Sequence, residues 1–166
     1  MTPADLKQPL LTRLLRYVQV HTTSDAKSAT VPSTPQQWDL LHLLRDELTA
    51  MGLADITLDD KGYLFATLPA TTDRAVPVLG LLAHVDTAPD FSGENVRPQV
   101  VEHYDGGDIR LAGSGAVLSP QDFPQLGELR CSDGCSPVSS GVQALMISAS
   151  NASKGSPLWS ERKASI

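Results

Sequence analysis

The sequence is poor in cysteine, in aromatic residues and in long apolar runs. Its 166 residues include only two cysteines, Cys131 and Cys135, which are too few for a disulfide framework. The longest apolar stretch, residues 76–83, is far too short to span a bilayer. The N-terminus lacks the basic start and apolar run of a signal peptide. We therefore expect a cytoplasmic protein that does not insert into a membrane.

Positive charge is also scarce, and this argues against one large class of partner. The net charge is -6, and Lys and Arg form no basic stripe. Nucleic acid is not an expected partner, because phosphate binding needs clustered cations. Cys131 and Cys135 have no partner Cys or His nearby, so we interpret them as an incidental pair and not as half of a metal site.

Composition changes sharply after residue 126. Residues 1–126 contain 35 Leu, Ile, Val and Phe, whereas residues 127–166 contain 7 in 40. The second value lies below the roughly 20% that a segment needs to build a core. Serine rises from 6 before the boundary to 10 after it, and no helical or strand period is visible there. We predict an ordered part, 1–126, and an aberrant, disordered tail, 127–166.

Two helices and a hairpin are expected before the boundary. Leucines at helical spacing predict a helix over residues 6–18, and a second apolar stripe predicts a helix from about residue 35 to Met51. Ser33 or Thr34 is the expected cap of the second helix, and Gly52 its end. Residues 55–58 and 63–68 predict two strands joined by a turn at 59–62.

The continuous apolar run from Val76 to His84 predicts a buried central strand. Helices that precede a buried strand are typical of an α/β fold, with helices packed on a sheet. His84-Val85-Asp86 lies where this strand would end, and ligands of open α/β sheets bind at such ends. His84 and Asp86 share a face of the strand because residues two apart point to the same side.

A neutral imidazole is a good zinc ligand, and a nearby carboxylate either fixes its tautomer or binds the metal itself. On its own the tripeptide fits a surface ion pair or a turn cap more often than a metal site. The longer segment His84-Val85-Asp86-Thr87-Ala88-Pro89-Asp90, however, resembles the metal-binding segment of the peptidase T family of di-zinc aminopeptidases. Further blocks are similar to that family in the expected order: 31–34 with Gln37 and Trp38, 93–102, Tyr104 with 106–109, and 118–120 with Phe123, Pro124 and Leu126.

The resemblance implies the N-terminal part of a zinc-peptidase catalytic domain, in which helices pack on a mixed sheet. It implies two zinc ions that activate a water, a glutamate general base, and release of the N-terminal residue from tripeptides. His84 corresponds to a ligand of one zinc, and Asp86 to the catalytic carboxylate that orients this histidine. A homodimer is possible for the intact enzyme.

The family's remaining metal segments are not found in this sequence. The pattern requires Gly-Ala-Asp-Asp-Lys, a Glu-Glu pair, a further aspartate and a distant histidine, so we expect an inactive fragment. Residues 143–148 can be encoded CAG GCG CTG ATG ATA AGC, in which another frame reads Gly-Ala-Asp-Asp-Lys. A frameshift in the tail is therefore our hypothesis.

Two alternatives remain open at this point. A related di-zinc carboxypeptidase or deacylase would carry a similar strand-end motif, although the block at 118–126 argues against it. A stable, non-catalytic binding protein is the other alternative, and it predicts cooperative unfolding of the purified chain.

Overall fold

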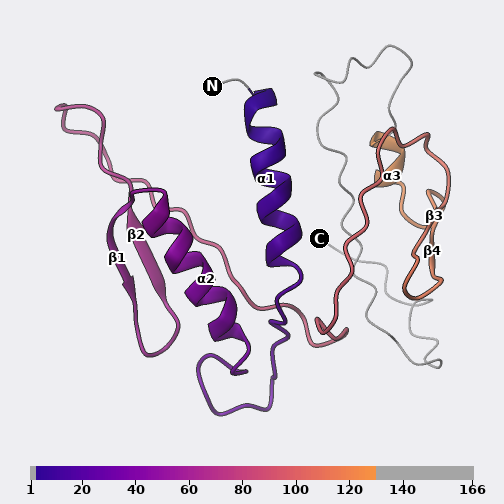
Figure 1. The fold of residues 1–166 in the computed structure, drawn as a ribbon, viewed down its shortest axis with the longest axis horizontal. Coiled ribbons are helices and arrows are strands. Elements are labelled where there is room, and N and C mark those ends of the chain that lie inside the picture. Colours follow the sequence, from indigo (N-terminus) through magenta and orange to yellow (C-terminus); the bar gives the residue numbers. More distant parts are fainter. Residues whose placement is uncertain (1–2, 130–166) are drawn as a thin grey trace.

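Helices and small antiparallel hairpins make up residues 3–129, the part of the chain that the computed structural model describes (Figure 1). The elements follow one another as α1 (Pro3–Tyr17), α2 (Gln37–Ala50), β1 (Ala54–Leu58), β2 (Leu64–Thr67), β3 (Ile109–Arg110), β4 (Val117–Leu118) and α3 (Gln125–Glu128). β1 pairs with β2 and β3 pairs with β4, both antiparallel. The predicted mixture of helix and sheet is confirmed, but the described residues form no mixed sheet.

Helix α1 is held to α2 by a polar cluster around Glu47. Arg16 Nη1 lies 2.8 Å from Glu47 Oε1, and Arg13 Nε lies 3.6 Å from Oε2. The Tyr17 hydroxyl donates a hydrogen bond to the same carboxylate. The expected leucine stripe of α1 is partly uncovered, because Leu6, Leu10 and Leu14 keep 41%, 58% and 43% of their surface exposed. The contact between the two helices therefore includes charged and polar groups at the C-terminal end of α1.

The start of α2 differs from the prediction. Gln36 occupies the capping position, and its side chain makes no capping hydrogen bond. The expected caps, Ser33 and Thr34, instead accept hydrogen bonds from the side-chain amide of Gln37, each at 3.0 Å. That amide reaches back toward the preceding turn, so the two hydroxyls are occupied by a side chain and not by the backbone of the helix.

The end of α2 and the following hairpin agree with the prediction. Gly52 has φ +78°, a left-handed conformation that glycine adopts without strain, and it ends the helix. In the hairpin turn, Asp59 Oδ1 accepts the backbone N–H groups of Lys61 and Tyr63 at 3.0 and 2.8 Å. Gly62 supplies the positive φ, +79°, that this turn needs.

The prediction of a buried strand over residues 76–84 is wrong for this chain. Val78 is 98% exposed and Leu82 is 96% exposed, and no strand is formed between β2 and β3. A strand is stabilised by hydrogen bonds to a neighbour, and residues 76–83 make no backbone hydrogen bond to another described residue. Among the described residues, parallel pairing is limited to an isolated bridge between Thr23 and Thr87, just beyond this run.

A small apolar core lies in the second half of the described chain. Its buried members are Tyr104, Ile109, Leu111 and Leu126, and Val101, Leu118, Phe123 and Leu129 pack against them.

None of the helices within residues 3–129 has the length and apolar character needed to cross a bilayer. The tail from residue 130, with Cys131, Cys135 and 143–148, lies outside the described residues, so the predicted boundary after 126 stays a prediction.

Candidate metal-binding corner

The structure brings the side chains of His84 and Asp86 together. His84 Nδ1 lies 3.1 Å from Asp86 Oδ1 and 2.9 Å from the backbone oxygen of Asp86. Two oxygen acceptors at Nδ1 favour the tautomer that carries its proton there, which leaves the Nε2 lone pair available. The imidazole is well placed to use that lone pair, because the His84 side chain is 83% exposed and that of Asp86 44%.

The backbone immediately after this pair is fixed by a segment far earlier in the chain. The Thr87 N–H donates to the carbonyl of Thr22 at 3.0 Å, and the Ser24 N–H donates to the carbonyl of Thr87 at 2.9 Å. The Ser24 hydroxyl donates to the same carbonyl at 3.0 Å. Thr22 is only 3% exposed, so this bridge is partly shielded from water. The bridge fixes the chain one residue beyond Asp86.

Thr23 adds two more links to this bridge. Its hydroxyl oxygen accepts the Gly93 N–H at 2.7 Å, and its carbonyl accepts the hydroxyl of Thr34 at 2.8 Å. A larger residue at 93 would crowd this contact, because a Cβ there would lie 2.9 Å from Thr23 Oγ1, so one of the two groups would have to shift. We call Thr22, Thr23, Ser24, Thr87 and Gly93 the threonine junction.

Sequence reasoning missed the threonine junction. The loop from residue 22 to 35 reads only as a polar, Ser- and Thr-rich connection. Its hydrogen bonds join positions 63 and 70 residues apart. No period or short motif in a single sequence signals such contacts, so the residues that position His84 and Asp86 were not identified in advance.

The described residues do not form a complete metal site. Within residues 3–129, no three His, Cys, Asp or Glu side chains gather closely enough to hold an ion. A structural or catalytic zinc ion takes at least three protein ligands. The pairing of His84 with Asp86 has the geometry expected of a histidine and an orienting carboxylate, and within residues 3–129 no further potential ligands gather around it.

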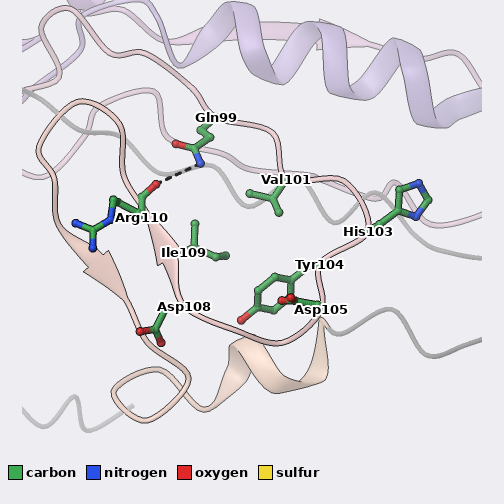
Figure 2. Close-up of a pocket in the computed structure, with 8 residues that line it drawn as sticks. All are labelled: Gln99, Val101, His103, Tyr104, Asp105, Asp108, Ile109 and Arg110. Atoms are coloured by element: carbon green, nitrogen blue, oxygen red, sulfur yellow. Dashed lines mark hydrogen bonds between the residues drawn. The ribbon is translucent and has the colours of Figure 1, made fainter.

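A separate pocket of about 300 Å³ lies against the apolar core (Figure 2). It is lined by Gln99, Val101, His103, Tyr104, Asp105, Asp108, Ile109 and Arg110. Burial, followed by the charges of Asp105 and Asp108, raises the pKa of Tyr104. Its hydroxyl donates to the carbonyl of Gly107 at 2.6 Å, so it is already satisfied within the fold. Neither His84 nor Asp86 lines this pocket.

Comparison with known proteins gives close relatives. The chain is 58% identical over 121 residues to peptidase T of Lysinibacillus sphaericus, which is 73% of this chain and 29% of that protein. It is 56% identical over 122 residues to peptidase T of Geobacillus kaustophilus, or 73% of this chain and 30% of that protein. It is 52% identical over 124 residues to peptidase T of Staphylococcus aureus, which is 75% of this chain and 30% of that protein. No family model matches the sequence.

Proposed function

We propose that this chain, related to proteins named peptidase T over about three quarters of its length, contributes part of the catalytic domain of a metal-dependent aminopeptidase. The chain spans about 30% of the length of these relatives. A match of 121 residues within 166 includes residues 46–121 wherever it begins, so His84 and Asp86 lie inside it. The observation that carries the proposal is the contact of His84 Nδ1 with Asp86 inside this matched region.

We propose zinc as the metal, with two ions in the complete site. His84 would bind one of them through Nε2, and Asp86 would orient the ring through Nδ1. Carboxylates and imidazoles elsewhere in the complete enzyme would provide the other ligands. A single imidazole holds zinc weakly, because affinity and geometry are set by the full ligand set. The 166-residue chain by itself is therefore expected to hydrolyse no peptide.

Tripeptides are the proposed substrates, with release of the N-terminal residue, and the cytoplasm is the proposed location. This proposal rests on the similarity described above and on the blocks of sequence that carry it. Nucleic acid and membranes are not proposed partners. Homodimerisation of the complete enzyme is compatible with the proposal.

The test is a chimera in which residues 1–126 of this chain replace the matched segment of the Lysinibacillus sphaericus peptidase T. We expect zinc-dependent release of the N-terminal residue from tripeptides. Asp86→Ala should lower activity by about 10- to 100-fold, the usual effect of removing the partner of a metal-binding histidine. Asp60→Ala, in the exposed hairpin turn, is the control. A folded chimera that instead cleaves C-terminal residues or N-acyl groups would favour a carboxypeptidase or deacylase.

We propose that the reading frame is lost between Leu126 and Val142, so that the rest of the tail is read in a shifted frame. The support is its serine-rich composition and the Gly-Ala-Asp-Asp-Lys sequence that one choice of codons for residues 143–148 contains in another frame. Sequencing codons 127–148 decides this. Absence of the aspartate pair from all three frames would rule out the frameshift.

A further inference from the structure

An apolar segment just before the candidate metal-binding corner lies exposed and is not paired with another described segment. Its most exposed members are Val78 at 98%, Leu79 at 81%, Leu81 at 90% and Leu82 at 96%. Figure 1 draws no strand between β2 and β3. Isolated exposed leucines are ordinary, but a contiguous exposed run of this kind marks an interaction surface. We call residues 76–84 the apolar run.

Both sides of the apolar run are apolar. In an extended chain, Val78 and Leu82 point to one side and Leu79 and Leu81 point to the other. No backbone hydrogen bond joins residues 76–83 to another described residue. Full burial of the run thus requires strand neighbours along its edges and side chains over both of its faces.

This requirement discriminates between the possible occupants. A second copy of the chain that paired with the run edge to edge would leave both apolar faces in water. Residues 127–166 contain only 7 Leu, Ile, Val and Phe, which is a poor supply of side chains for covering two faces. The relatives, in contrast, have about 70% of their length outside the match, enough for both strands and covering helices.

We propose that the apolar run is a docking edge for a complementing polypeptide, namely the part of a peptidase T that lies outside the region matched by this chain. The partner adds backbone strands beside residues 78–84 and apolar side chains on both faces. Docking orders the segment that precedes His84. The segment that follows His84 is already fixed by the backbone hydrogen bonds of Thr87. The inference rests on the proposed function, since it takes this chain to be one portion of such a domain.

The experiment mixes the purified 166-residue chain with the unmatched part of the Lysinibacillus sphaericus peptidase T, expressed as a separate polypeptide. We expect a 1:1 complex by sedimentation, and at least 10-fold slower amide hydrogen exchange over residues 78–84. Leu81→Asp and Leu82→Asp, one on each face, should each weaken the complex at least 10-fold. Leu68→Asp is the matched control, because Leu68 is 81% exposed but lies outside the run.

Three results would overturn the proposal. One is a complex that leaves the exchange of residues 78–84 unchanged, and another is protection of the run by self-association of the chain alone. The third is loss of binding with only one of the two face variants, since the run would then be covered on a single side.

If the separate partner polypeptide does not fold, the chimera tests the same docking edge, because it joins the two parts in one chain. In the chimera described above, residues 78–84 should exchange at least 10-fold more slowly than in the 166-residue chain. A folded chimera with an unprotected run contradicts the docking edge. A protected run in a chimera without tripeptidase activity supports the docking edge and contradicts the proposed function, so the two failures can be told apart.

Discussion

The hydroxyl oxygen of Thr23 accepts the backbone N–H of Gly93 at 2.7 Å, across 70 positions of the chain. The same loop carries the backbone bridge from Thr22 and Ser24 to Thr87. These contacts hold both the loop before α2 and the segment that follows His84 and Asp86. Because Thr87 is one residue beyond Asp86, the junction limits how far the pair can move as a unit.

Removing the Thr23 hydroxyl should loosen this junction. Thr23→Val keeps the shape of the side chain but leaves the Gly93 N–H without its acceptor, a loss of about 1 kcal/mol for one hydrogen bond. We expect Gly93 and Thr87 amides to exchange about fivefold faster, measured by NMR hydrogen exchange. Thr23→Ser, which keeps the hydroxyl, should restore the rate. Equal exchange in the Val variant and the parent would show that the bond does not order this segment.

The tautomer of His84 should depend on Asp86. Nδ1 faces both the side-chain and the backbone oxygen of Asp86, so Asp86→Leu removes one of two acceptors. We expect the neutral ring to shift part of its population toward the tautomer protonated at Nε2. Long-range nitrogen–proton NMR at alkaline pH measures this shift. His42 is the internal control, since its side chain contacts Trp38 and lies on another element. An unchanged tautomer would mean that the backbone oxygen alone fixes the ring.

Local sequence signals predicted local structure well. The hairpin and the glycine that ends α2 were both foreseen, because Gly52 and Gly62 adopt conformations that few other residues tolerate. Capping by Ser33 or Thr34 was predicted incorrectly, since a competing side-chain amide, that of Gln37, occupies both hydroxyls. That competition involves three side chains at once, which a rule for single positions does not consider.

Non-local structure was predicted less well. An apolar run of strand length predicts burial only if neighbours exist to pair with it, and residues 76–84 have none among the described residues. The pairing of His84 with Asp86 was foreseen from their two-residue spacing, although they are not in a strand. The threonine junction had no sequence signal, because its partners lie far apart in the chain.

Two glycines with the same backbone conformation provide a matched test of packing. Gly62 and Gly52 have φ of +79° and +78°. A Cβ at Gly62 would lie 2.8 Å from Pro32 Cγ and 2.9 Å from Leu41 Cδ1, whereas a Cβ at Gly52 would meet nothing within 4 Å. Both Ala variants have the left-handed strain of about 1–2 kcal/mol. Gly62→Ala adds an overpacking cost of about 1–3 kcal/mol, because the proline ring is stiff.

Amide exchange in the β1–β2 hairpin measures this difference. We expect Gly62→Ala to accelerate exchange at the paired positions more than Gly52→Ala does, by at least fivefold. Equal acceleration by the two variants would indicate that Pro32 and Leu41 move aside at little cost, and that backbone strain alone governs the hairpin.

The cluster that joins α1 to α2 should respond to alkaline pH. Burial, together with the hydrogen bond to Glu47 and its negative charge, raises the pKa of Tyr17 from 10.0 to about 12. The raised pKa means that the folded chain favours the neutral Tyr17 hydroxyl. The contact is therefore fully stabilising below pH 10, and this stabilisation is lost as the pH rises from 10 through about 12. The difference in tyrosinate absorbance between the parent chain and Tyr17→Phe should therefore titrate near pH 12.

Glu47→Gln should move that midpoint toward 10, because it removes the negative charge while it keeps an acceptor for the hydroxyl. Asp46→Gln, on the neighbouring exposed position, should leave the midpoint unchanged. A Tyr17 midpoint near 10 in the parent chain would show that the tyrosine does not contact Glu47 in solution.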